Sequence, residues 1–448
     1  MTCEEPSAGV PARDKQAEKD LWPRHGAERG VWTEPMLAAL ERGLEGNKWF
    51  SLIDKVWSER TLGLAWEKVK SNAGACGVDG ITVGRFAQDS QSRLLAVKEQ
   101  LQQGTYQPKP VKRVWIPKPG STERRPLGVP TVKDRVVQAA LKMVIEPVFE
   151  SRFAEGSYGF RPGRGCQDAL RHVERLLRAG FTHVVDVDIK GYFDTISHDR
   201  LMGHVRERIA DGRVLGLIEA LLKQGVIEAT DWLQAKEEGT PQGGVISPLL
   251  ANIYLDPLDW KMAGSGFAMV RYADDMVVLC RSREEAEAAL SVLKQWMEDA
   301  GLSLHPEKTR VVDMAKAEGC FDFLGYRFKR TQRGRLIRLV RPKSLRRLKQ
   351  TIRGKSRRNN GQSMEAIVAA LNPVLRGWFH YFQHVHVSEL MEIDQWLRGR
   401  LRSILRKREG RRGRGRGHDH HRWRKHYFKL LGLFCLLDAR ESLVANLP

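Results

Sequence analysis

Apolar residues recur at helical spacing over long stretches of the chain and predict most of its secondary structure. Between these stretches lie short runs of β-branched residues, Val111–Ile116 and His183–Ile189, which predict strands. A turn-rich segment, GACGVDG at Gly74–Gly80, interrupts the first helical stretch. Helices are expected within residues 47–85 and over Val132–Glu150, Gln167–Ala179 and Asp199–Lys223. The mixture of the two patterns favours an α+β fold.

The middle of the chain carries the clearest order of elements. Two short apolar runs in Ala268–Cys280 flank Asp274–Asp275 and predict a β-hairpin with the two acids at its tip. Ser282–Glu285 is a capping box that opens a helix, and Gly301 ends that helix. Its apolar face is formed by Ala286, Leu290, Leu293 and Met297. Strand, helix, hairpin and helix in this order are typical of a ferredoxin-like sheet.

After Arg341 the pattern becomes all-helical. Helices are expected at Ser344–Arg358, Met364–Phe382 and Glu389–Lys407. The segment Arg408–Phe428 alternates Gly with Arg and cannot build a core, so we expect a loop or an arm that orders on a partner. Residues 1–46 are expected to form a flexible N-terminal tail, since the first 30 are rich in Pro, Ala, Gly and charge.

Charge is distributed unevenly along the 448 residues. The whole chain has a formal net charge of +21, yet residues 329–448 alone hold 30 Lys and Arg against 8 Asp and Glu, an excess of +22. Residues 1–328 therefore sum to −1. A cationic final quarter on a near-neutral body indicates a polyanionic partner, either nucleic acid or an anionic membrane surface.

Several classes of protein are disfavoured by composition. The six cysteines lie far apart without a C-x-x-C pair, which disfavours a disulfide framework and a cysteine zinc site. No uncharged apolar run approaches the roughly 18–20 residues that span a bilayer. The N-terminus has acids and no apolar core of a secretory signal. We expect a reduced, soluble, cytoplasmic protein.

Three carboxylates are the main candidates for chemistry: Asp188 at the end of a strand, and Asp274 and Asp275 at the hairpin tip. A buried charge is costly unless it is paired or bound to metal, and these acids are flanked by Val and Ile. Two Mg²⁺ ions could stabilise both the attacking and the leaving oxygen of an in-line displacement at phosphorus. The alternative is an ordinary Asp–Asp turn.

Longer motifs in a fixed order favour the first interpretation. The four leading motifs are IPKPGSTERRPLGVPTVKDRVVQ (Ile116–Gln138), VDVDIKGYFDTI (Val185–Ile196), GTPQGGVISPLLANIYLDPLD (Gly239–Asp259) and RYADD (Arg271–Asp275). Together they resemble reverse transcriptases, and the third of them resembles the group II intron-encoded class in particular. Later segments, GLSLHPEKTR, FDFLGYRF, LRGWFHYF and HHRWRKHYFKLLGLFCLLDA, are similar to that family's later blocks, its maturase region and its C-terminal end. The resemblance covers residue 47 to the end.

The resemblance implies a role for eight residues. Asp188, Asp274 and Asp275 would be catalytic and would bind two Mg²⁺ ions, with Mn²⁺ as a possible substitute. The incoming dNTP would be met by Lys118 and Arg125 from the fingers, by Phe193 as a steric gate against the ribose 2′-hydroxyl, by Gln242 and by Lys308. Each dNTP candidate has a structural alternative: core packing for Phe193, a plain turn for Gln242, and a solvated surface cation for each of Lys118, Arg125 and Lys308.

The basic region offers a second set of candidates. The segment Ser344–Arg358 carries no acid, unlike most solvated helix faces, so phosphate contact is the better interpretation. Trp378, Phe379, Tyr381 and Phe382 are expected to pack between helices, and the histidines at 418, 420 and 421 to contact RNA rather than metal. The RNA-binding candidates are Arg346, Arg347, Lys349, Arg353, Lys355, Arg357, Arg358, Arg411, Arg412, Arg414 and Arg416.

The expected molecule is a right-hand polymerase. Fingers and a ferredoxin-like palm would occupy residues 47–340, a helical thumb or maturase domain residues 341–408, and a basic extension residues 409–448. The implied activity is RNA-directed DNA synthesis for a group II intron, with intron-RNA binding that assists splicing and retrohoming. The implied partners are intron RNA, an RNA template, a DNA primer or target and dNTPs, and the oligomeric state stays open.

Two other functions remain open at this point. One is a domesticated or defence-type reverse transcriptase, and the other is an RNA-binding splicing cofactor without a polymerase role. Many intron-encoded relatives end in an H-N-H endonuclease with paired cysteines, which we do not expect here. Second-strand cleavage or priming would then depend on another source.

Overall fold

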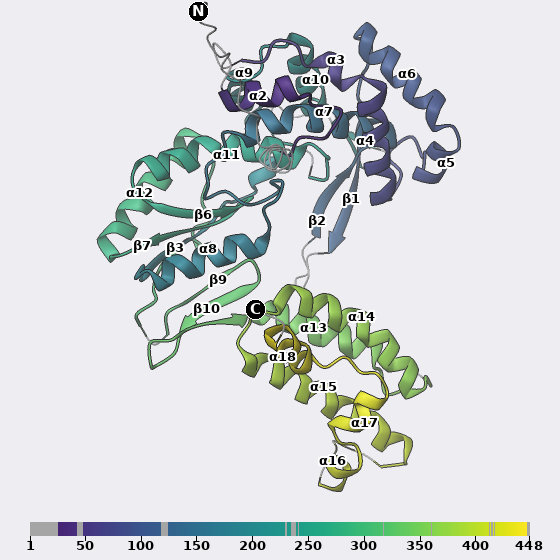
Figure 1. The fold of residues 1–448 in the computed structure, drawn as a ribbon, viewed down its shortest axis with the longest axis vertical. Coiled ribbons are helices and arrows are strands. Elements are labelled where there is room, and N and C mark those ends of the chain that lie inside the picture. The colour runs from purple at the N-terminus through teal and green to yellow at the C-terminus, as the bar shows by residue number, and fades with distance from the viewer. Residues whose placement is uncertain are drawn as a thin grey trace, which may run out of the picture.

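The protein's fold is described by a computed structural model, which places three parts around a central space (Figure 1). Fingers lie at the top of the view, a palm at the left and a helical thumb at the lower right. The thumb continues from the palm through a small sheet. The described residues are 26–42, 48–117, 124–228, 231–233, 239–240, 242–316, 318–359, 361–411, 413, 415 and 417–445.

The fingers are built on a four-stranded sheet with the order β2-β1-β4-β5. β1 and β2 form an antiparallel hairpin that points toward the thumb, and β1 pairs in parallel with β4 (Figure 1). The helical stretch expected from residue 47 is divided because Ser58 caps a new helix there, accepting a hydrogen bond from the Thr61 amide at 3.1 Å. The elements are α3 (Ile53–Val56), α4 (Glu59–Asn72), α5 (Val83–Ala87), α6 (Ser90–Gln103), β1 (Val111–Pro117), β2 (Arg124–Val129), α7 (Val132–Glu150), β4 (Val226–Glu228) and β5 (Asp231–Leu233).

Part of the expected N-terminal tail is packed structure. Residues 26–42 include α2 (Glu34–Arg42), and Trp32 is buried in the fingers core. The Trp32 indole Nε1 donates to the carbonyl of Met143 at 3.2 Å, and its ring meets that of Trp49 edge-on. The prediction of a flexible tail rested on local composition. It could not take into account that Trp32 packs against a distant part of the chain at Met143.

The palm sheet is antiparallel with the order β6-β7-β3-β8, formed by β3 (His183–Asp188), β6 (Ala268–Tyr272), β7 (Asp275–Cys280) and β8 (Arg310–Asp313). Counted from β8 along the sheet, the strands are fourth, first, third and second in the chain, which is the ferredoxin-like arrangement. α8 (Cys166–Arg178) covers one face, and α11 (Ser247–Gly264) and α12 (Arg283–Asp299) cover the other. The predicted ferredoxin-like palm is confirmed.

The single helix expected at Asp199–Lys223 is two helices, α9 (His198–Arg206) and α10 (Gly212–Leu222). Asp211 separates them, and its carboxylate accepts the amides of Arg213 and Val214 at the start of α10. The same carboxylate accepts the amides of Leu52 and Ile53 at the start of α3. One buried acid thus caps two helices that are far apart in the chain.

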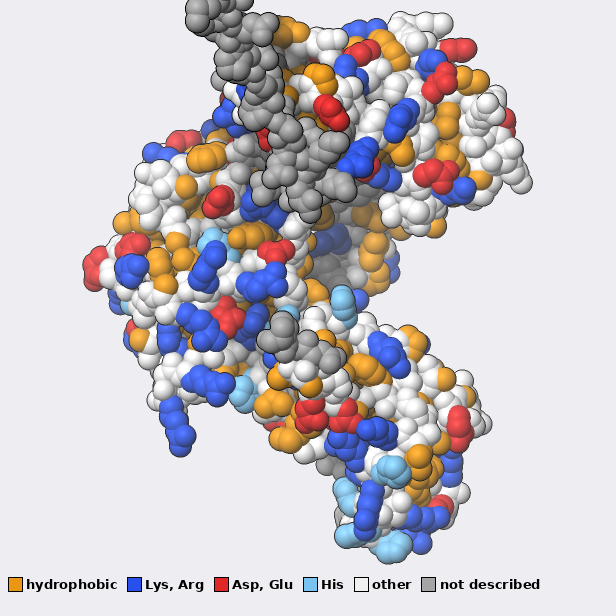
Figure 2. Space-filling view, in the orientation of Figure 1, with side chains coloured by type: hydrophobic (Ala, Val, Ile, Leu, Met, Phe, Trp, Pro, Cys, Tyr) orange, Lys and Arg blue, Asp and Glu red, His pale blue; other side chains and the backbone are white. Residues whose placement is uncertain are grey.

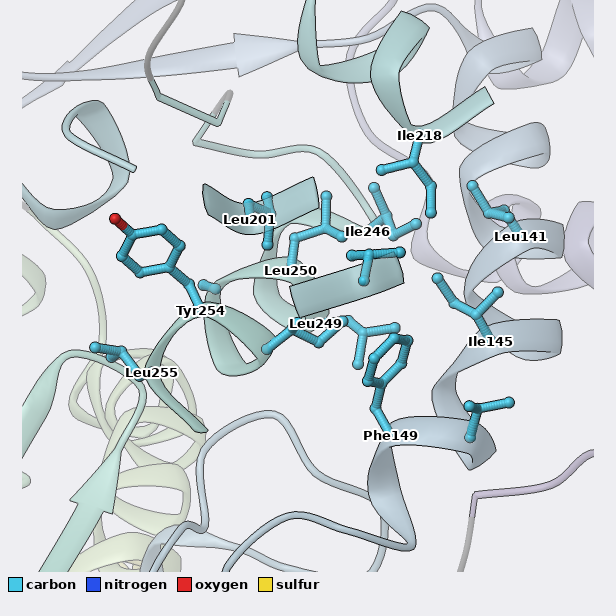
Figure 3. Packing of buried hydrophobic residues seen from close by; sticks show 14 of the residues in the cluster. Leu141, Ile145, Phe149, Leu201, Ile218, Ile246, Leu249, Leu250, Tyr254 and Leu255 are labelled. Carbon is cyan, nitrogen blue, oxygen red and sulfur yellow. The ribbon is translucent and has the colours of Figure 1, made fainter. Parts of the chain in front are cut away.

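A first hydrophobic core joins fingers and palm. α7 is buried on nearly all sides, and its residues Leu141, Ile145 and Phe149 point toward α11 (Figure 3). From α11, Leu249 and Leu250 meet them, with α9 and α10 closing the cluster. A helix that is buried on nearly all sides is the expected consequence of packing at such a junction.

A second core runs from the other palm face into the thumb. It includes α8, a three-stranded sheet with the order β11-β10-β9, and the first thumb helices. Of the expected thumb helices, the one at Met364–Phe382 matches its prediction in both bounds, with Ser363 as its cap. The elements are β9 (Cys320–Phe323), β10 (Tyr326–Arg330), β11 (Leu336–Val340), α13 (Pro342–Lys355), α14 (Met364–Phe382) and α15 (Val387–Arg408).

The segment expected as a loop or arm over Arg408–Phe428 is partly helical. α16 (His418–Arg422) and α17 (Lys425–Leu430) lie against α15, followed by α18 (Leu436–Ala445). Trp423 and Phe428 are buried in the second core. The prediction of a loop followed the average composition of the segment, which is dominated by Gly and Arg. It gave no weight to these two aromatic residues, whose burial stabilises the short helices.

Two further observations concern membrane spans and disulfide bonds. No helix in the described parts of the chain is both long and apolar enough to cross a membrane. The five cysteines that the structure describes, Cys76, Cys166, Cys280, Cys320 and Cys435, form no disulfide.

Candidate active site

The three candidate aspartates meet at one end of the palm sheet. Asp188 is the last residue of β3 and lies opposite Asp275, the first residue of β7, in the strand register. Asp274 occupies the turn between β6 and β7, directly before Asp275. The antiparallel pairing of β3 with β7 therefore brings together Asp188 and Asp275, which are 87 positions apart in the chain.

The electrostatics of this end of the sheet is dominated by burial and like charge. Burial raises the pKa of Asp274, and the neighbouring Asp188 raises it further, while Arg125 lowers it. Burial, then Asp186 and Asp274, raise the pKa of Asp275 to about 7. Several carboxylates thus share a site whose own cations compensate them only in part.

The two acids of the turn have different surroundings. Asp274 is close to Asp188 and to the fingers cation Arg125. The Asp275 carboxylate accepts a hydrogen bond from the backbone amide of Leu324, in the turn between β9 and β10. Asp274 therefore faces the fingers side of the site, and Asp275 faces the sheet that leads to the thumb.

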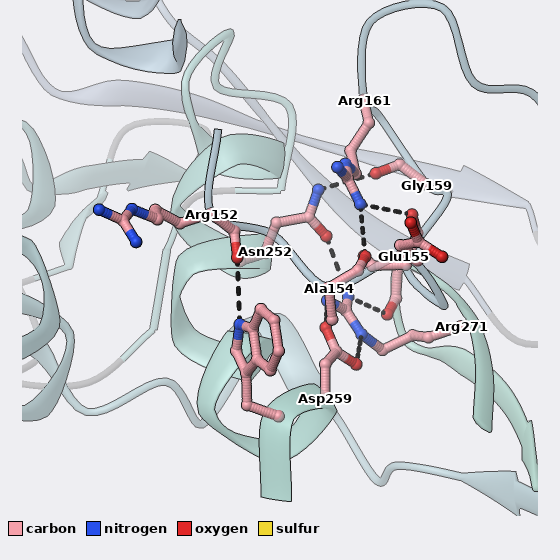
Figure 4. A network of polar contacts seen from close by, with 12 residues as sticks. Arg152, Ala154, Glu155, Gly159, Arg161, Asn252, Asp259 and Arg271 are labelled. Atoms are coloured by element: carbon pink, nitrogen blue, oxygen red, sulfur yellow. Dashed lines mark hydrogen bonds and ion pairs between the residues drawn. The ribbon is translucent and has the colours of Figure 1, made fainter. Parts of the chain in front are cut away.

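A buried arginine supports the turn that carries Asp274. Arg271, with no exposed surface, donates Nε to Asp259 Oδ1 at 2.8 Å and Nη1 to Asn252 Oδ1 at 3.0 Å (Figure 4). Nη1 also donates to the carbonyl of Ala273 at 3.0 Å. Ala273 has a positive φ of 59°, which is unfavourable for a residue other than glycine. The arginine thus holds the strained residue immediately before Asp274.

The same network fixes the loop between α7 and α8, which motif reasoning passed over. Asn252 Nδ2 donates to the carbonyl of Gly159, and Gly159 packs so closely on the Ala273 amide that a Cβ would lie 2.3 Å from that nitrogen. Arg161, which is also buried, pairs with Glu150. Between them Phe160 is exposed, has a φ of 58° and lies 6.2 Å from the Tyr272 ring. The available signal was the run of Gly, Arg and Pro in YGFRPGRG, which predicts tight turns.

The candidate nucleotide-binding residues come from several elements. Arg125 on β2 is exposed, and Phe193 in the short 3₁₀ helix η2 (Tyr192–Asp194) is half-buried against the first core. The backbone of Gly239–Thr240 rests on Phe193, whose carbonyl accepts the Thr240 amide at 2.8 Å. Lys118 lies outside the described residues.

The loop that carries Gln242 is fixed to the fingers. The Gln242 carbonyl accepts the amide of Gly128 on β2 at 2.6 Å. A Cβ at Gly243 would lie 2.4 Å from the Gly128 carbonyl, and the φ of Gly243 is 113°, so only glycine fits. Gln138 on α7, which sequence reasoning missed, accepts the Val245 amide at 2.7 Å. The loop thereby joins β2 and α7.

Lys308 is placed against an aspartate. Its Nζ lies 3.3 Å from Asp188 Oδ1, and both side chains are partly exposed, at 57% and 43%. The preceding His305 donates its amide to the Asp188 carbonyl at 2.8 Å. A salt bridge in solvent is weak, so this lysine is free to exchange partners when an anion enters.

The thumb cations are largely exposed. All candidates from Arg346 to Arg358 are exposed except Lys349, which is half-buried and lies over the Trp396 ring, as Arg353 does, at 5.5 and 5.6 Å. A cavity of about 890 Å³ opens between the end of α13, α15 and the following segment. Its cationic lining is Arg357, Arg358, Arg400, Lys407 and Arg411. Arg412, Arg414 and Arg416 lie outside the described residues.

The histidines near the C-terminus flank an ion-paired acid. Asp419 is buried and pairs with Arg406 at 2.5 Å and with Arg411 at 3.8 Å. His418, His420 and His421 are exposed around it. Among the described residues, no group of three or more His, Cys, Asp and Glu is arranged to hold a metal ion.

Comparisons with known proteins agree with this geometry. The family model "Reverse transcriptase (RNA-dependent DNA polymerase)" matches residues 116–328, and "Group II intron, maturase-specific domain" matches residues 345–427. The protein YkfC of Escherichia coli K12 is 35% identical over 304 residues, which cover 58% of this chain and 78% of YkfC. The group II intron-encoded protein LtrA of Lactococcus lactis subsp. cremoris is 40% identical over 199 residues, which cover 44% of this chain and 32% of LtrA.

Solved structures provide looser matches. A chain of a partial Cas6-RT-Cas1–Cas2 complex aligns with a TM-score of 0.37 and 24% identity, over 57% of this chain and 43% of that one. Telomerase from Candida albicans aligns with a TM-score of 0.41 and 13% identity, over 78% of this chain and 68% of that one.

Proposed function

The chain belongs to the group II intron-encoded reverse transcriptases with a maturase-specific domain, and we propose that Asp188, Asp274 and Asp275 are its catalytic carboxylates. The observation that carries the proposal is the meeting of these three acids at the end of a ferredoxin-like sheet. The proposed reaction is attack by a DNA primer's 3′-hydroxyl on the α-phosphate of a dNTP, directed by an RNA template, with release of pyrophosphate.

The donor set fits a hard divalent cation. Asp188 and Asp274 offer carboxylate oxygens, the charge of Asp188 raises the pKa of Asp274, and oxygen ligands of this kind suit Mg²⁺ or Mn²⁺. Mg²⁺ usually takes one or two carboxylates and completes its shell with water and substrate phosphate, so two acids suffice on the protein's side. Two such ions, when bound, would stabilise the charge on the attacking and leaving oxygens.

The residues around the acids suit a triphosphate. Arg125, exposed on β2 and near Asp274, would meet its phosphates, and Lys118, in the same hairpin's loop, is proposed to join it. Lys308 would release Asp188 and turn to the substrate's charge when the nucleotide binds. Phe193 and the Gln242 loop would form the walls beside the sugar and base, with Phe193 excluding a 2′-hydroxyl by contact.

Intron RNA is the proposed partner of the basic thumb. Figure 2 shows Lys and Arg side chains gathered at the far end of the thumb, with histidines among them. The exposed cations of α13 and the cavity beside them provide a surface that neutralises phosphates without reading sequence. We propose that this surface serves splicing and retrohoming and that Arg411, Arg412, Arg414 and Arg416 extend it.

Primer extension tests the catalytic part. Purified protein, a labelled DNA primer and an RNA template should give extended primer in Mg²⁺, and Asp274→Asn should reduce the rate at least about 10³-fold, because metal-ion charge stabilisation supplies several kcal/mol. Glu298→Gln, an exposed acid on α12, is the matched control and should retain the rate. Equal rates for Asp274→Asn and wild type would refute the site.

Splicing tests the maturase part with the same variants. A precursor RNA that carries the intron should splice faster with wild type and equally fast with Asp274→Asn, because RNA binding depends on the thumb. Loss of splicing in Asp274→Asn with intact RNA binding would contradict this division. No synthesis by wild type, together with accelerated splicing, would favour a pure splicing cofactor.

A further inference from the structure

The turn between β9 and β10 has a conformation that its residues do not favour. It consists of Leu324 and Gly325, with φ values of 48° and 83°, between the paired residues Phe323 and Tyr326. A two-residue hairpin loop with positive φ at both positions is a type I′ turn, for which Asn-Gly is the preferred sequence. A bulky residue such as Leu at the first position is an outlier that must be held by its surroundings.

This turn reaches the active site. The backbone amide of Leu324 donates a hydrogen bond to the Asp275 carboxylate. The other groups that most affect the pKa of Asp275 are the acids Asp186 and Asp274 and the cation Arg341. The Leu324 amide thus acts on one candidate catalytic carboxylate, and its position depends on the unfavourable φ of its own residue.

The contacts that hold the turn come from the thumb side. The Tyr381 hydroxyl, on α14, donates to the Leu324 carbonyl at 2.7 Å. The Arg341 amide, at the start of the thumb, donates to the Gly325 carbonyl at 2.9 Å. Gly325 also faces the Phe382 ring, which would lie 3.5 Å from a Cβ there. The end of α14 and the start of α13 therefore hold the turn from the thumb.

We propose that Tyr381 is a positioning residue for DNA synthesis, and the proposal rests on the catalytic role of Asp275 proposed above. By binding the Leu324 carbonyl, the Tyr381 hydroxyl keeps that residue left-handed and its amide directed at Asp275. The placement of α14 against the palm is then transmitted to the active site through Leu324. Its carbonyl accepts the bond from the Tyr381 hydroxyl, and its amide donates to Asp275.

A purely structural role for Tyr381 has a matched control within the same cluster. The Tyr326 hydroxyl donates to the Tyr381 carbonyl, so Tyr326→Phe removes a hydroxyl from the same aromatic group without touching the turn. Cys166 also contacts the hydroxyls of Tyr381 and Tyr272, and Cys166→Ala removes both contacts while leaving the bond from Tyr381 to Leu324 in place. Only Tyr381→Phe removes the bond to Leu324, and it retains the ring packing.

The test measures kcat and KM for dNTP and the divalent-ion concentration at half-maximal rate. Tyr381→Phe should lower kcat about five- to tenfold, the scale of one hydrogen bond, raise the divalent-ion concentration required and leave KM within about twofold. Tyr326→Phe and Cys166→Ala should keep kcat within about twofold. Leu324→Asn added to Tyr381→Phe should restore at least half of wild-type kcat, because Asn adopts the turn conformation without a clamp.

Three results would overturn the proposal. The first is an equal loss of kcat in Tyr381→Phe and Tyr326→Phe, which would indicate packing alone. The second is failure of Leu324→Asn to restore kcat in the double variant while thermal unfolding stays at the wild-type temperature. The third is wild-type kcat in Tyr381→Phe. Absence of synthesis by wild type would instead remove the proposed function, and the positioning role with it.

Discussion

Loss of Asp259 should destabilise the palm strongly, because it would leave Arg271 charged and buried without its counter-ion. The two side chains are 0% and 2% exposed, and the carboxylate accepts from both Nε and Nη2 of the guanidinium. Removing one partner of a buried pair typically costs about 3–5 kcal/mol, since the remaining charge keeps its desolvation penalty. Asp259→Ala is therefore expected to lower the free energy of unfolding by about that amount.

Urea denaturation followed by tryptophan fluorescence and circular dichroism would measure this loss. The control is Glu287→Ala, which removes the carboxylate of an exposed pair with Arg283, whose side chains are 58% and 71% exposed, and it should leave the midpoint almost unchanged. Similar midpoints for Asp259→Ala and Glu287→Ala would refute the reasoning.

A double variant separates stability from activity. Arg271→Met with Asp259→Leu removes both charges and should recover most of the stability lost in Asp259→Ala. Ala273 would still lack the donor that holds its carbonyl, so primer extension should remain low in the double variant. Full recovery of synthesis would mean that Arg271 does not support the turn that carries Asp274.

Three other predictions concern charge, pH and backbone space. Asp275→Asn should stabilise the metal-free protein by about 2–4 kcal/mol at pH 8 and by about 1–1.5 kcal/mol at pH 5, because the folded pKa of about 7 lies above the unfolded value of about 4 and wild type loses stability as pH rises between these two values. Equal urea midpoints for variant and wild type at pH 8 would contradict this expectation. Arg357→Ala with Arg358→Ala should lower the slope of log affinity for RNA against log salt by about 1–2, as filter binding at several salt concentrations would show, whereas a flat dependence in wild type would exclude phosphate binding as the main term. Gly243→Ala should reduce primer extension at least about tenfold by pushing its loop off Gly128, while Gly216→Ala, in open space on α10, should leave the rate unchanged; retained activity in Gly243→Ala would show that the loop can shift.

The sequence predicted those helices and strands whose apolar spacing and end signals lie within the element itself. Val132–Glu150 and Met364–Phe382 have helical apolar spacing and a Thr or Ser cap, and both were predicted to the residue. The hairpin at Ala268–Cys280 was predicted because its two apolar runs are broken only by the acids at the tip.

The expected and observed elements differ where a local signal was overlooked or where a distant contact decides. Asp211 caps α10 locally through the amides of Arg213 and Val214, a signal that helical spacing alone overlooked. The burial of Trp32 depends on the distant Met143, which no local window contains. For the site, the order of motifs along the chain selected the candidate acids, while the contacts of Arg271 and Leu324 beside them became visible only in the fold. Tertiary partners, more than propensity, decided the last two cases.

The second core has a consequence for how this chain can be divided. Val277 of the palm sheet, Phe328 of β10 and Leu375 of α14 belong to one buried cluster, so the covalent boundary near residue 341 crosses a continuous interior. A fragment cut there would expose apolar surface on both pieces and should be insoluble alone. The two pieces co-expressed should instead reassemble by complementation, and recombination that exchanges one without the other would be tolerated only between relatives that match across this interior.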